Sequence, residues 1–219
     1  MSTGLTKEEV NRKLLHLIAV ILPAGIFYGP ELLGLERIWI CSIIFGMLLT
    51  SLSIEFARFG NEDFGIFFGR CFGSMMRPEE GRQLTGATYV LAGSATCSLL
   101  SLHDELAAAC AFLALTLFIL GDAAAALVGK AIGRIRIGGK TLEGAMGCLL
   151  VCIALAAFAF PGIPGFLENW RGEYGWIQIL VVSSTVTILE LFPIKLGRMA
   201  LNDNLYVPAF ASVVVWLVS

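Results

Sequence analysis

Long apolar segments alternate with short polar ones along almost the whole chain. Seven of them predict membrane-spanning helices, at 13–30, 36–54, 84–102, 105–128, 143–160, 174–193 and 204–218. Each has close to the roughly 20 residues that a helix needs to cross the hydrocarbon core of a bilayer. Helix breakers such as Gly29-Pro30, Pro161-Gly162 and Pro193 separate several of these segments. The pattern therefore predicts an all-α, polytopic membrane protein.

The composition agrees with this pattern. Of the 219 residues, 57% are hydrophobic and only 15% are charged, whereas about 25% are charged in a typical soluble domain. We expect one integral membrane catalytic domain, 1–219, with cytoplasmic loops at 55–83, 129–142 and 194–203. The phenylalanines of the first loop are compatible with a helix lying on the membrane surface or with an ordinary ordered loop. Most of the six cysteines lie in apolar runs, where we expect them to pack as small hydrophobic residues.

The positive charges predict the orientation of the chain. With seven spans, 13 of the 15 Lys and Arg residues fall on the same side as the N-terminus, and only Arg37 and Arg171 fall on the other. Because basic loops remain in the cytoplasm, the N-terminus is expected to be cytoplasmic and the C-terminus to lie on the opposite side.

Polar residues within or beside the spans gather at one depth in this topology. They are Arg12, His16, Glu55, Asp122, Glu190, Asn202, Asp203 and Asn204. Ionisable groups are costly inside a membrane, so each is a functional candidate. A path across the bilayer would scatter such groups through its depth. Their common level therefore favours a pocket at the cytoplasmic membrane surface over a small transporter or flippase.

The densest motif is GDAAAALVGKAIGRIRIGGKTLEG, residues 121–144. Gly121, Gly129 and Gly133 recur on one helical face, which lets another helix or a ligand approach the backbone. Asp122 and Lys130 lie two turns apart, about 12 Å along a continuous helix. Packing between helices and anchoring at the lipid headgroups are the alternative explanations for these glycines and for Lys130.

The second half of the motif suits a phosphate-bearing ligand. Gly138 and Gly139 allow backbone amides to approach phosphate oxygens, and Lys140 supplies positive charge. Three further candidates, Thr141, Glu143 and Gly144, stand at the start of the fifth span, where helix amides favour an anion. An acid followed by a Gly- and Lys-rich loop suits magnesium–nucleotide binding, with Asp122 on the hard cation and Lys140 on phosphate. The spacing of the phosphate loop of soluble nucleotidases is absent.

These residues resemble the CTP-dependent lipid kinases, a family that includes dolichol, phytol and farnesol kinases and the yeast-type diacylglycerol kinase, and that is related to the phosphatidate cytidylyltransferases. The pattern G-D-x-x-A…G-K-T-x-E-G carries most of the resemblance. Weaker matches are Arg12-Lys13-x-x-His16, LTGATYVLAG at 84–93, Glu190 and NDNLYVP at 202–208. The chain is much shorter than dolichol kinase and is more similar to the compact, phytol-kinase-like prokaryotic members.

The resemblance implies transfer of the γ-phosphoryl group of CTP to the hydroxyl of a membrane isoprenoid alcohol or diacylglycerol. Asp122 and Asp203 would bind Mg²⁺, and Lys140, with Lys130, would stabilise phosphate. The nucleotide would also contact Gly121, Gly133, Gly138, Gly139, Thr141, Gly144 and Asn204. Glu143, Glu190 and Asp203 are alternative acceptors of the hydroxyl proton, and Arg12 and His16 would contact phosphate or line the acceptor site.

The alternative reactions are cytidylyl transfer, which yields a CDP-lipid, and transport. We expect a multi-pass protein of a prokaryotic inner membrane with a cytoplasmic active site and no nucleic-acid partner. A monomer and a homodimer both remain open.

Overall fold

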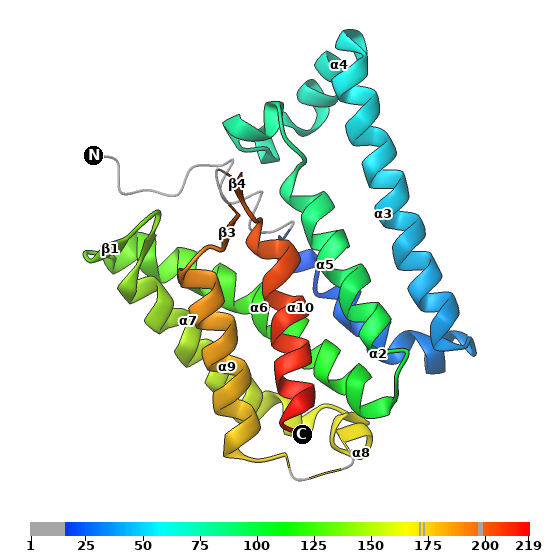
Figure 1. The fold of residues 1–219 in the computed structure, drawn as a ribbon, viewed down its shortest axis with the longest axis vertical. Coiled ribbons are helices and arrows are strands. Elements are labelled where there is room, and N and C mark those ends of the chain that lie inside the picture. Colours follow the sequence, from blue (N-terminus) through cyan, green and yellow to red (C-terminus); the bar gives the residue numbers. More distant parts are fainter. Residues whose placement is uncertain (1–15, 171, 173, 197–198) are drawn as a thin grey trace.

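The structure, a computed structural model, describes residues 16–170, 172, 174–196 and 199–219 (Figure 1). Helices dominate it, and the strands form two short hairpins. The helices are α2 (Ile21–Leu33), α3 (Arg37–Gly60), α4 (Glu62–Phe72), α5 (Gly86–Leu100), α6 (Glu105–Ile132), α7 (Leu142–Ala154), α8 (Phe166–Trp170), α9 (Trp176–Leu191) and α10 (Asp203–Leu217). Short helical turns are η1 (Gly73–Met75), η2 (Pro78–Gly81), η3 (Leu155–Ala159) and η4 (Phe160–Gly162), and the strands are β1 (Arg136–Ile137), β2 (Lys140–Thr141), β3 (Lys195–Leu196) and β4 (Met199–Ala200).

Four helical segments are long and apolar enough to cross a membrane: His16–Leu33, Arg37–Gly60, Glu105–Ile132 and Leu142–Gly162. Helices α5, α9 and α10 are also apolar but shorter. An apolar helix therefore overlaps each of the seven predicted spans, and the predicted helical membrane character is confirmed. The number of complete crossings and the orientation of the termini stay predictions.

Helix α6 forms the centre of the bundle. Its residues from Ala107 to Ile119 are all buried, and it packs against α2, α5, α7, α8, α9 and α10. The Asp104 side chain begins the helix by accepting a hydrogen bond from the Ala107 amide at 2.7 Å, which satisfies one of the amides left open at a helix start. Alanines along this helix leave room for its neighbours, and Phe112 stacks on Phe27 with 4.8 Å between ring centroids.

The connections gather at two ends of the bundle. Figure 1 shows α4 and both hairpins toward one end, and α8 and the C-terminus toward the other. In the glycine-rich hairpin β1–β2, Arg136 pairs with Thr141 and Ile137 with Lys140. That the segments 55–83 and 129–142 share one side of the membrane stays a prediction.

Three boundaries differ from the prediction. Helix α3 continues to Gly60 rather than ending near residue 54, because 55–59 contain no helix breaker, so Glu55 lies inside the helix. Helix α6 likewise continues through Lys130 to Ile132, as the Asp122–Lys130 spacing requires. The segment 133–141 forms a hairpin rather than an irregular loop, with Gly138 at φ +63° in its turn, a backbone conformation that glycine adopts without steric cost.

Candidate active site

Lys140 links two acidic residues that are distant in sequence. Its Nζ atom donates to Glu190 Oε1 at 2.6 Å and to Asp203 Oδ2 at 2.8 Å. The three side chains come from β2, the end of α9 and the start of α10. Burial lowers the pKa of Lys140, but the charges of Asp203 and Glu190 outweigh burial and raise that pKa to about 12. Lys140 is therefore charged at neutral pH and holds the two carboxylates at one point.

Asp122 lies beside His16. The His16 Nε2 and Asp122 Oδ2 atoms are 3.4 Å apart, and 12% and 25% of the two side chains are exposed. Asp122 projects from α6, whereas His16 begins the first apolar segment, 106 positions earlier in the chain. The Asp122 carboxylate thus has an imidazole neighbour from another segment.

The start of α10 is held against α5. The Asn202 side chain accepts from the Asn204 amide at 3.1 Å and so caps the helix that carries Asp203. The Asn204 side chain donates to the carbonyl of Gly86 at 3.4 Å. Gly93 contacts the backbone of α10 so closely that a β-carbon there would collide with the Asn204 carbonyl. These contacts place Asp203 without making it part of the core.

The glycines of the 121–144 motif divide into two groups. A β-carbon at Gly121 would lie 2.9 Å from both Cys148 Sγ and Cys152 Sγ, and one at Gly144 would lie 2.6 Å from the Ala125 carbonyl. These glycines, with Gly129 and Gly133 against Thr141, therefore allow α6 and α7 to approach closely. By contrast, Gly138 and Gly139 in the hairpin turn have no atom within 4 Å of such a β-carbon, so only this second group is open to a ligand on that side.

Thr141 and Glu143 serve the local structure of the hairpin. The Thr141 hydroxyl accepts from the Gly144 amide at 3.1 Å and caps α7. Both carboxylate oxygens of Glu143 accept from the Ile135 amide at 3.2 Å. Glu143 thereby fixes the base of the hairpin that carries Lys140.

Glu55 was a candidate by its depth, but the buried cluster of donors around it was not predicted. Glu55, only 2% exposed, accepts from the Thr85 amide at 2.8 Å, the Thr85 hydroxyl at 2.6 Å and the Thr88 hydroxyl at 2.9 Å. Its other oxygen accepts from Arg58 Nε at 2.5 Å. The signal in the sequence was an acid followed three positions later by Arg58, together with two threonines in LTGATYVLAG.

A cavity of about 550 Å³ joins these features. Of the predicted site residues, His16, Asp122, Asp203 and Asn204 line it, and so do Glu55 and Thr85 of the second cluster. Lys140 and Glu190 do not line the cavity. Lys140 contacts Asp203, which does, and Glu190 contacts Lys140. Lys130 is exposed two turns beyond Asp122, and Arg12 lies outside the described residues.

The cavity offers few residues that could hold a metal ion. Within the described ranges, no group of three or more His, Cys, Asp and Glu side chains forms a metal site. Mg²⁺ keeps several waters and commonly takes only one or two protein carboxylates together with substrate phosphates. Asp122 and Asp203, on the wall of one cavity, supply two carboxylates of that kind.

Two proteins are similar to this chain in sequence. An uncharacterized protein of Rickettsia prowazekii is 26% identical over 203 residues, which are 91% of this chain and 89% of that protein. The dolichol kinase of Saccharomyces cerevisiae is 34% identical over 97 residues, which are 42% of this chain and 16% of the kinase. No family model and no solved structure matches the chain. The match to dolichol kinase therefore covers less than half of this chain and less than a fifth of the kinase.

Proposed function

We propose that this protein is a CTP-dependent lipid-alcohol kinase of the membrane, with its active site at the cytoplasmic end of seven spans. One observation carries the proposal: Asp122 and Asp203 lie on the wall of a cavity whose other walls are largely apolar. A lipid alcohol is itself a polar hydroxyl on an apolar chain. The carboxylates suit the metal-bound phosphates, and the apolar walls suit the lipid.

In this proposal Asp122, with Asp203, holds Mg²⁺, which would neutralise phosphate charge when bound. Lys140 keeps Asp203 in place through its hydrogen bond. An ammonium group has three N–H donors, and Glu190 and Asp203 take two of them, so the third can reach a phosphate oxygen. Gly138 and Gly139 give the triphosphate access to the hairpin backbone.

The reaction forms a bond between the lipid hydroxyl oxygen and the γ-phosphorus and breaks the bond from that phosphorus to the β,γ-bridging oxygen, so CDP leaves. Of Glu143, Glu190 and Asp203, only Asp203 lines the cavity, and we assign the hydroxyl proton to it. His16 lies on the acceptor wall beside Asp122. Phosphoryl transfer depends mainly on positioning and electrostatic stabilisation, so the choice of base matters less than the geometry.

Product analysis tests the proposal. Purified protein in lipid nanodiscs would be incubated with Mg²⁺, with CTP or ATP, and with farnesol, phytol, a long polyprenol or diacylglycerol. We expect CDP and a phosphorylated alcohol, with CTP preferred. Pyrophosphate release with a CDP-lipid would instead identify a cytidylyltransferase. An absence of any nucleotide-dependent product, combined with movement of lipid between leaflets, would favour a flippase.

A further inference from the structure

The cavity has two chemically different walls. One wall carries the polar groups of the proposed active site, His16, Asp122 and Asp203. A second part of the lining, here called the apolar wall, comes from the first apolar segment, α3 and α4. It includes Ile18, Ile21, Met47, Ile54, Phe67 and Phe72.

The apolar wall is continuous with the outer surface of the protein. Ile18 is 65% exposed, Phe67 is 60% exposed and Ile54 is 39% exposed, although all three line the cavity. Such side chains are stable at an outer surface that faces hydrocarbon, where burial in protein gains little. These exposed lining residues belong to the His16–Leu33 segment, α3 and α4, so this part of the cavity borders the outer surface of the apolar helices.

Helix α4 contributes aromatic side chains to the cavity. None of its residues is buried, yet Phe64, Phe67, Phe68 and Phe72 all line the cavity. A short helix with an aromatic face and a polar face is typical of the membrane interface. For this segment the sequence analysis left open an interfacial helix and an ordinary ordered loop.

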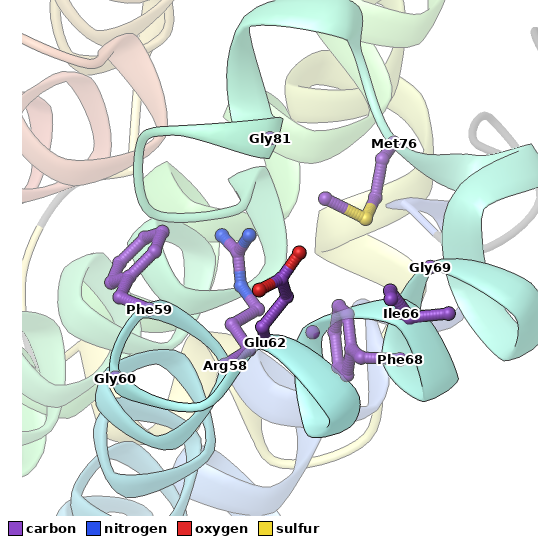
Figure 2. Close-up of a pocket in the computed structure, with 10 residues that line it drawn as sticks. Arg58, Phe59, Gly60, Glu62, Ile66, Phe68, Gly69, Met76 and Gly81 are labelled. Atoms are coloured by element: carbon purple, nitrogen blue, oxygen red, sulfur yellow. The ribbon is translucent and has the colours of Figure 1, made fainter.

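Arg58 connects α4 to the buried cluster. Figure 2 shows its side chain in a second hollow, of about 540 Å³, between Phe59 and Phe68. The Arg58 Cζ atom is 4.3 Å from the centroid of the Phe59 ring and 5.4 Å from that of Phe68, while its Nε atom binds Glu55. The position of Phe68 in the cavity wall is thus tied to a fixed charge pair in α3.

We propose that the cavity holds the chain of the lipid alcohol, which passes between the His16–Leu33 segment and α3, beneath the aromatic face of α4, with its hydroxyl at Asp122 and Asp203. This assignment rests on the proposed function for the identity of the hydroxyl. The occupant is a single isoprenoid or acyl chain, because the apolar wall offers contacts suited to a hydrocarbon chain and unsuited to a triphosphate. The volume lies within the roughly 300–1,000 Å³ of small-molecule sites.

Photo-crosslinking tests the path of the chain without requiring turnover. The probe is farnesol with a diazirine at the end of the chain away from the hydroxyl, applied to the full protein in nanodiscs without nucleotide. We expect labelling of α3 and α4 peptides that is displaced by unlabelled farnesol. Ile54→Trp, which fills the cavity, should reduce labelling by about tenfold, a change of roughly 1.4 kcal/mol in binding.

Ile43→Trp is the matched control, because Ile43 is an isoleucine of the same helix that is 51% exposed and is not part of the cavity wall. It should leave labelling unchanged. If Ile54→Trp does not fold, Met47→Trp with Leu49→Trp as its control makes the same comparison. Equal labelling in each pair, or labelling displaced by CTP but not by farnesol, would overturn the inference. Specific labelling without phosphorylation of any alcohol would support the lipid site and reject the kinase.

Discussion

Two acidic clusters border the same cavity and differ in how their oxygens are used. Glu55 is 2% exposed and accepts hydrogen bonds from Thr85, Thr88 and Arg58. Asp122 and Asp203 have about a quarter of their side chains exposed and lie beside His16 and Lys140, respectively. A carboxylate that is saturated with donors holds helices together, whereas one that is partly open to a cavity can bind a ligand. Exposure to the cavity and the number of bound donors together distinguish the structural acid from the proposed functional ones.

The largest expected effect is on Asp122. Asp122→Asn removes the negative charge but keeps the size of the side chain, and it should lower the rate of phosphate transfer by about 10²–10³-fold or more, as the loss of a single electrostatic group does elsewhere. Radiolabel transfer to the lipid alcohol measures this. Asp63→Asn, at an exposed position in the first turn of α4, is the control and should retain activity. Full activity in Asp122→Asn would remove this carboxylate from the mechanism.

Glu55 should show the opposite behaviour. Glu55→Gln leaves the buried Arg58 without its counter-charge, and breaking a buried pair costs about 3 kcal/mol or more. We expect a clearly lower thermal unfolding temperature in nanodiscs, while the protein that remains folded still transfers phosphate. Loss of activity without loss of stability would place Glu55 among the functional acids and would end the distinction between the two clusters.

Lys140 combines both roles. Lys140→Met removes the cation between Glu190 and Asp203. We expect the free energy of unfolding to fall by roughly 2 kcal/mol. This is less than for a fully buried pair because 27% of the Lys140 side chain is exposed. The double variant Lys140→Met/Glu190→Gln should recover part of this stability, since it removes the uncompensated buried charge. Neither variant should restore turnover, because Asp203 remains unsupported. An unchanged nucleotide KM and kcat in Lys140→Met would contradict the role assigned to the loop.

The smallest effect concerns pH. The pKa of Lys140 is raised from 10.5 to about 12 by Asp203 and Glu190 after the opposing effect of burial, so the folded state favours the charged lysine. The resulting stability is fully present below pH 10.5 and is lost as the pH rises through about 12. Between neutral pH and pH 9, the difference in unfolding temperature between wild type and Lys140→Met should therefore stay constant. A difference that already disappears by pH 9 would mean that the ion cluster does not form.

The apolar helices could be predicted because hydrophobic runs and breakers are local. Contacts between residues distant in sequence could not be predicted in this way. The glycine-rich surroundings of Lys140 predicted that it binds phosphate. Its partners in the structure, Glu190 and Asp203, lie 50 and 63 residues away. No spacing rule identifies pairs so distant in sequence. The end of α3 was wrong because no residue before Gly60 stops the helix. The Glu55 cluster was missed because its donors, Thr85 and Thr88, are ordinary residues until α5 packs on α3.

The transfer of label from the γ-position of CTP to a lipid alcohol, measured side by side for wild type, Asp122→Asn and Asp63→Asn, tests the central claim most directly. The account predicts a phosphorylated alcohol and an equal amount of CDP from wild type and Asp63→Asn, and almost none from Asp122→Asn. Label released as pyrophosphate, or equal transfer by all three proteins, would contradict it.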